Sequence, residues 1–190
     1  MTKGGGAYHH GDLRAAVLRA AVEVISESGP GAVSLRDLAR RAGVSHAAPA
    51  HHFGDKAGLL TAVATEGFEL LADELTDARD AGADFLLIGV RYVGFAVDHR
   101  AHFEVMYRPD LYHPDDPAVV AARERAGVAL YEGAGALAGA SDGRLAAIGA
   151  WSLMHGFATL WLNRNLPADL APDPGRAAAE VAEAFLRATT

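Results

Sequence analysis

The chain has 190 residues, of which 51% are hydrophobic and 22% charged, an ordinary composition for a globular protein with one or two hydrophobic cores. It contains no cysteine, which excludes disulfides and thiolate metal sites. The sequence has no uninterrupted run of 18 apolar residues and no signal-peptide pattern at its start. We therefore expect a cytoplasmic protein with no membrane partner.

The net charge of −7 is unevenly distributed along the chain. Residues 1–58 carry seven Lys or Arg and five Asp or Glu, a net charge of +2, which leaves −9 for the remainder. A basic head on an acidic body is typical of a protein that contacts DNA through one end. A net charge of only +2 also arises by chance. Whether this end of the chain contacts DNA is therefore decided by the sequence motif in residues 34–56, described below.

The first 33 residues predict a short arm followed by a helix. The glycines at positions 4–6 indicate a flexible arm, which is either functional or simply a frayed end. Hydrophobic residues then recur at helical spacing up to the break at residues 28–31. These residues are Leu13, Val17, Ala20 and Val24.

Residues 34–42 predict a second helix. Ser34 is expected to cap it through its hydroxyl group, with Asp37 as the reciprocal partner. Four positions at helical spacing form its buried face: Leu35, Leu38, Ala39 and Ala42.

A tight turn and a third helix follow. Gly43 is expected to take the left-handed conformation that ends a helix. Ser45 is expected to cap a short helix from His46 to about residue 52, which Gly54 breaks before Asp55 caps the next helix. Two helices joined in this way are the plan of a helix-turn-helix, whose second helix enters the major groove of DNA.

The remaining sequence predicts helices and no β-structure. The expected helices cover residues 55–80, 85–100, 117–138, 144–163 and 175–188, with a short apolar segment at 102–107. We therefore predict an all-α fold. Residues 1–58 would form an arm and a three-helix DNA-binding domain, and residues 59–190 a helical body.

Residues from about 10 to 65 resemble the DNA-binding domain of the TetR family of transcriptional regulators. The matching features are the helix that begins at Ser34, the Ala39-to-Gly43 spacing, the Gly43-Val44-Ser45 turn, the His52-Phe53 pair, and Lys56 followed by Leu59-Leu60. The resemblance implies a homodimer that binds a double-stranded DNA operator and responds to a small-molecule effector. Its simplest role would be that of a repressor released by the effector, with no cofactor.

The resemblance also implies which residues of this head contact DNA. Bases would be faced by Ser45, His46, Ala47, Pro49 and His51, and phosphates by Arg36, His52 and Lys56. This chain departs from the family pattern at Ala50, where relatives usually carry a tyrosine that touches the DNA backbone. It also departs at Ala47 and Pro49, where relatives tend to have a glycine and an aliphatic residue.

Two groups of side chains in the body are candidates for effector binding. The first is a run of aromatic, histidine and methionine residues that forms either a pocket or plain core: Tyr92, Phe95, His99, Phe103, Met106 and Tyr107. The second is Trp151 and His155, which with Gly156 have a W-x-x-x-H-G spacing similar to the WHG class of TetR-family C-terminal domains. Their helix is either part of the dimer interface, together with the last helix, or a pocket wall.

Other functions find less support in the sequence. Asp98, His99, His102 and His113 suggest a metal site, but three or four converging ligands are needed and no second pair exists, so we expect no metal. No nucleophile with a base and no paired carboxylates are evident, so we expect no enzyme. The alternative is an α-helical small-molecule-binding protein or enzyme whose helix-turn-helix does not read DNA.

Overall fold

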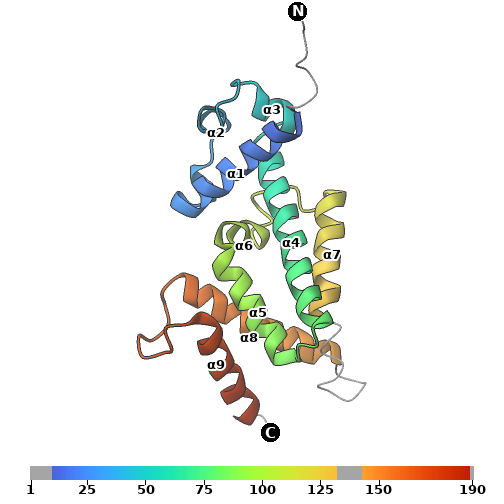
Figure 1. Ribbon diagram of the computed structural model, residues 1–190, viewed down its shortest axis with the longest axis vertical. Helices are drawn as coiled ribbons and strands as arrows, with labels where there is room; N and C mark the ends of the chain where they lie inside the picture. Colours follow the sequence, from blue (N-terminus) through green and yellow to red (C-terminus); the bar gives the residue numbers. More distant parts are fainter. Residues whose placement is uncertain (1–9, 132–142, 189–190) are drawn as a thin grey trace, which may run out of the picture. The chain divides into compact units, whose positions relative to one another are not determined.

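A computed structural model describes residues 10–131 and 143–188, and all regular secondary structure in these residues is helical (Figure 1). The predicted all-α fold is therefore confirmed. The N-terminal arm and the glycines at positions 133, 135 and 139 lie outside the described residues. The elements are α1 (His10–Ser28), η1 (Pro30–Ala32), α2 (Leu35–Arg41), α3 (Ala48–Phe53), α4 (Lys56–Asp80), α5 (Phe85–Asp98), α6 (Arg100–Met106), α7 (Pro117–Tyr131), α8 (Gly143–Leu162) and α9 (Pro174–Ala188).

The chain forms two compact units. The first, called the head unit here, contains Met1–Gly67 and Ala101–Val120, and the second, called the body unit, contains Phe68–Arg100 and Ala121–Thr190. Both α4 and α7 contribute residues to each unit. The domain boundary expected between residues 58 and 59 falls inside α4 and stays a prediction.

The head unit is held together by the apolar faces of α1, α2 and α3, which pack against one another (Figure 1). Val17 and Ala21 of α1 and Leu38 of α2 are fully buried. Arg14 of α1 places its guanidinium 5.3 Å from the centre of the Phe53 ring, a cation–π contact that adds a polar tie between α1 and α3.

A buried threonine joins α4 to the loop before α7 within the head unit. The Oγ1 atom of Thr61 donates to the carbonyl oxygen of Ala57 at 2.7 Å and accepts from the backbone N–H of His113 at 3.0 Å. Thr65, one turn later, only donates to the carbonyl oxygen of Thr61, at 2.8 Å. Thr61 therefore satisfies a loop N–H that Thr65 does not reach.

The body unit is built around α5, which packs against α8 and α9 (Figure 1). Tyr92, Val93 and Ala96 of α5 are fully buried, as expected for a central helix. Asp84 caps α5 by accepting from the N–H of Leu87 at 2.8 Å, and Asp173 accepts from the N–H of Arg176 at 2.7 Å at the start of α9.

Helix α8 is long and apolar enough, by length and composition alone, to cross a membrane. Its sequence includes Arg144, Ser152 and His155. Met154 and Phe157 of the same helix are buried inside the protein. A single helix of this kind is weak support for a membrane span, because core helices of globular proteins have the same composition.

Replacing Thr61 with valine should destabilise the protein by about 1–3 kcal/mol, because the N–H of His113 would lose its partner. Thr65→Val is the matched control and should stay within about 0.5 kcal/mol of wild type. Urea unfolding of the three proteins measures the difference. Equal losses in the two variants would contradict the proposed role of Thr61.

Candidate functional site

The turn between α2 and α3 has the geometry that the sequence predicts. Gly43 adopts a left-handed conformation with φ of 66°. Its N–H donates to the carbonyl oxygen of Arg40, and the N–H of Val44 donates to that of Ala39 at 3.0 Å. These bonds satisfy carbonyl groups at the end of α2 and fix the direction in which the chain leaves it.

The caps of α2 and α3 differ from the prediction. Ser34 stands at the N-cap position of α2, but its side chain makes no capping hydrogen bond. Helix α3 begins at Ala48 rather than at His46, and Ala47, not Ser45, is its N-cap. The start is displaced because the carbonyl oxygen of Ser45 accepts from the N–H of Ala48, so residues 45–47 form a turn.

The junction between α3 and α4 is fixed by Asp55 and Gly58. The predicted cap is confirmed: Oδ1 of Asp55 accepts from the N–H of Gly58 at 2.8 Å. A Cβ atom on Gly58 would collide with the carbonyl oxygen of Phe53, so only glycine fits this close approach. Gly58 was missed by the sequence reasoning, since nothing in the local pattern distinguishes it from an ordinary helical glycine.

The α3 region presents one face to solvent and one to the interior. The exposed residues are Ser45, His46, Ala47, Ala50 and His51. His52 is half-buried, and its ring lies 5.4 Å from that of His51. Pro49, which was expected to face bases, is instead buried with Ala48 and Phe53. Proline is tolerated here because Pro49 occupies the second position of the helix, where its missing N–H costs no helical bond.

The basic side chains of the head differ in whether they are already engaged. Arg40 pairs with Asp37 at 3.5 Å and Arg41 with Glu27 at 3.1 Å. Nζ of Lys56 donates to the carbonyl oxygen of Gly31 at 2.9 Å. Arg36 is exposed and makes no ion pair or side-chain hydrogen bond with any residue that the structure describes.

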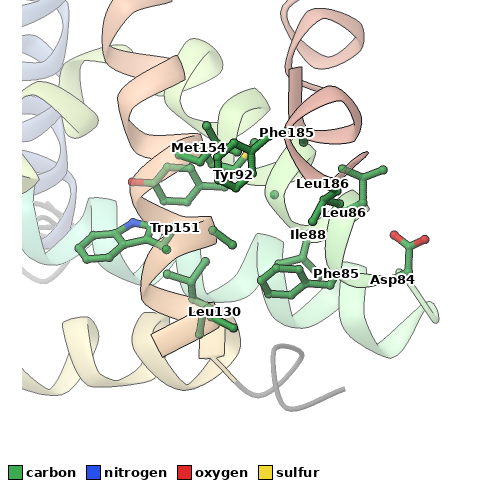
Figure 2. Close-up of a pocket in the computed structure, with 17 residues that line it drawn as sticks. Asp84, Phe85, Leu86, Ile88, Tyr92, Leu130, Trp151, Met154, Phe185 and Leu186 are labelled. Atoms are coloured by element: carbon green, nitrogen blue, oxygen red, sulfur yellow. The ribbon is translucent and has the colours of Figure 1, made fainter. Parts of the chain in front are cut away.

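A cavity of about 490 Å³ lies among α5, α8 and α9 in the body unit (Figure 2). Tyr92 and Trp151 of the predicted effector residues line it. Most of the wall is apolar and includes Phe85, Ile88, Leu130, Met154, Phe185 and Leu186. The sequence reasoning missed these six, because their helical spacing looks the same as that of core residues.

His155 is not one of the residues that line this cavity. Its Nδ1 atom is 2.8 Å from the hydroxyl oxygen of Tyr92, and its ring centre is 5.9 Å from that of Trp151. Burial lowers the pKa of His155, because an apolar environment disfavours the charged imidazolium. Because of its contact with Nδ1 of His155, the hydroxyl group of Tyr92 is hydrogen-bonded within the protein.

The predicted aromatic run does not form a single pocket. The rings of Phe95 and His99 are stacked at 4.9 Å and line a second cavity of about 400 Å³, also in the body unit, whose wall includes the charged residues Glu74, Arg91, Asp98 and Asp173. Phe103 and Met106 of α6 and Tyr107 just after it belong to the head unit and line neither cavity. The run is split because α5 ends at Asp98 and the chain enters a new helix at Arg100.

The metal hypothesis finds no support in this part of the chain. Across residues 10–131 and 143–188, no three His, Asp or Glu side chains are grouped so that they could hold a metal ion. His102 instead pairs with Glu66 through Nε2 and Oε2, 3.0 Å apart.

The fold and the exposed turn-and-helix surface define an all-α protein with a helix-turn-helix head. Residues 17–63 match the model of the tetR family of bacterial regulatory proteins, and residues 85–185 match that of the tetracyclin repressor-like C-terminal domain. The chain therefore belongs to the TetR family of bacterial regulatory proteins. Its membership of the WHG class stays a prediction.

Individual relatives agree with this assignment. A protein with unknown function from Rhodococcus sp. RHA1 is 34% identical, with a TM-score of 0.79, and the match covers 97% of this chain and 98% of that one. A bacterial regulatory protein in the tetR family from Rhodococcus RHA1 is 27% identical, with a TM-score of 0.69 and coverage of 92% and 95%. An HTH-type transcriptional repressor of Mycobacterium tuberculosis is 44% identical over 52 residues, 27% of this chain, and the match spans only 28% of that curated relative.

The lowered pKa of His155 predicts a pH dependence of stability. The unfolded chain takes up a proton near the ordinary histidine pKa of about 6.5, whereas the folded chain resists protonation until a lower pH. The corresponding stability is therefore present above pH 6.5 and is lost as the pH falls. His155→Gln should flatten the fall in the free energy of unfolding between about pH 7 and pH 5.

His113→Gln serves as the control, because His113 is exposed. Its stability should follow the wild-type pH curve in urea unfolding. A His155→Gln curve parallel to wild type would contradict the assigned effect of burial.

Proposed function

We propose that this protein is a sequence-specific DNA-binding transcriptional regulator, most simply a repressor, acting in the cytoplasm. The observation that carries the proposal is the face presented by the turn and α3. Ala48, Pro49 and Phe53 anchor this region to the head, while His46, Ala47 and their neighbours remain exposed. A short helix held by its buried face and exposed on the other suits insertion into a major groove.

The exposed residues divide into two roles. Ser45, His46, Ala47 and His51 are proposed to face base edges. Arg36, His52 and Lys56 are proposed to contact phosphates. Arg36 is the best placed of the three, because its charge is not engaged by another described side chain, whereas Lys56 already donates to Gly31.

We propose that the functional form is a homodimer joined through α8 and α9. Large apolar side chains are exposed on both helices of the single chain: Leu145, Ile148, Leu160, Phe185 and Leu186. Exposed apolar residues on two adjacent helices favour a helical bundle with a second copy. Such a dimer would present two α3 helices to half-sites about 34 Å apart on a palindromic operator.

The body is proposed to sense a small-molecule effector. The apolar cavity among α5, α8 and α9 adjoins the two helices assigned to the dimer interface. An effector that binds one dimer geometry more tightly than another would shift the population between them. Release from the operator follows if the favoured geometry cannot engage both half-sites.

The first test of this function is binding to the DNA upstream of the protein's own coding region, compared with a scrambled duplex of equal length at several salt concentrations. The proposal predicts selective binding to the upstream DNA with a steep salt dependence. Weak and equal binding to both duplexes, and to fragments taken across the surrounding operon, would contradict it.

Arg36→Ala should weaken binding to all DNA alike and reduce the slope of log affinity against log salt by about 1, because one phosphate contact is lost. Arg176→Ala on α9 is the control, since it removes the same charge from the body, where Arg176 pairs with Glu180. Electrophoretic mobility or fluorescence anisotropy titrations give the slopes. The control should keep the wild-type slope, and an unchanged slope in Arg36→Ala would mean that Arg36 does not contact a phosphate.

His46→Ala should change the preference at one base-pair position of each half-site by about 1–3 kcal/mol, because a base-edge contact is lost. Titration against single-substitution operator variants measures the preference. His113→Ala removes an exposed histidine of the loop before α7 and should leave the ranking of variants unchanged. If His46→Ala also leaves it unchanged, His46 does not read bases.

A further inference from the structure

We propose that the cavity among α5, α8 and α9 binds an uncharged, largely apolar small molecule. This inference deepens the proposed function and rests on it, because it names the chemical class of the effector. Four features of the cavity support it: its size, its wall, its charge and the state of its polar groups.

The size and wall of the cavity suit a small organic molecule. Its volume of about 490 Å³ falls within the range of roughly 300–1,000 Å³ that is typical of ligand sites. Aromatic and aliphatic side chains from four helices surround it, among them Phe85, Ile88 and Met154 (Figure 2). A ligand that fills this space therefore gains most of its affinity by removing apolar surface from water.

The scarcity of charged side chains in the wall disfavours the binding of an ion in the cavity. Among the residues that the structure describes, no lysine, arginine or histidine lines the cavity, and Asp84 is the only carboxylate in the lining. An anion would enter an apolar site without a counter-charge and next to Asp84, which is unfavourable on both counts. Asp84 is exposed and already caps α5. Its negative charge therefore offsets little of the cost of removing a cation from water and burying it deeper in the site.

The hydroxyl group of Tyr92, a polar group of the cavity wall, is engaged within the protein. The Tyr92 hydroxyl is held 2.8 Å from Nδ1 of His155, and burial lowers the pKa of His155, which keeps that ring neutral. Tyr92 is therefore proposed to offer its ring face to a ligand. A neutral molecule with few polar atoms fits such a wall better than a highly polar one.

Two fluorescent probes with the same ring system test the ligand class. N-phenyl-1-naphthylamine is uncharged, and 8-anilinonaphthalene-1-sulfonate adds one sulfonate to it. We expect the uncharged probe to bind at least tenfold more tightly to the full-length protein without DNA. Asp84→Asn keeps a capping side chain but removes the negative charge. This variant should reduce the ratio of the affinities of the two probes by about threefold.

A pair of glycines on α8 supplies the variants that locate the binding site. Gly149 lines the cavity and Gly156 does not, and a Cβ atom at either position would meet nothing within 4 Å. Gly149→Leu should reduce affinity for the uncharged probe at least tenfold, whereas Gly156→Leu should leave it within about twofold of wild type. Thermal unfolding and light scattering of both variants establish that fold and oligomeric state are retained.

The outcomes separate this inference from the proposed function. Tighter binding of the sulfonate probe, or equal loss of affinity in the two glycine variants, would overturn the inference while operator binding stands. Probe binding only after dilution to monomers would overturn it as well, and would mean that a second copy of the chain covers the cavity. Probe binding as expected without any operator binding would overturn the proposed function but not the apolar site.

Discussion

The position of α3 depends on the burial of one side of a very short helix. A helix of six residues is not stable alone in water, because the free-energy cost of helix nucleation exceeds the stabilisation from so few hydrogen bonds. Ala48, Pro49 and Phe53 supply the missing stability by packing inward. This burial also determines which side chains face out, so the candidate DNA surface follows from the packing of the head.

The position of α3 is restricted further by the turn that joins it to α2 and by the junction that joins it to α4. Gly43 ends α2 in the left-handed conformation. Gly58 lets the backbone of α4 begin directly against the carbonyl oxygen of Phe53. Both positions require glycine for a steric reason, one of conformation and one of space. The surface that we propose reads DNA is therefore held at both ends by the backbone.

The sequence predicts the helices of this fold well because they depend on local periodicity. The bounds of α4, α8 and α9 agree with the expected ranges within one residue, and the Gly43 turn is confirmed. The start of α3 was predicted two residues early, because Ser45 satisfies the usual capping pattern while its carbonyl oxygen forms a turn instead. The burial of Pro49 could not be read from its neighbours in sequence.

The cavity was harder to predict because its lining residues are distant in sequence and come together only in the tertiary structure. Tyr92 and Trp151 were identified by their chemistry, but Phe185 lies more than 90 residues after Tyr92 and has the same apolar pattern as any core residue. Phe103, Met106 and Tyr107 continue the aromatic run in sequence but belong to the head unit. Which apolar side chains share a cavity is therefore determined by helix packing, which composition does not reveal.

The central claim is that the head reads a specific DNA sequence, and selection from a pool of random duplexes tests it most directly. The purified protein is mixed with the pool, the bound DNA is recovered and sequenced, and the selection is repeated. The account predicts enrichment of a two-fold symmetric sequence whose half-sites are centred about one helical turn, roughly 10 base pairs, or a multiple of it apart. Recovery of DNA without any enriched sequence would contradict it.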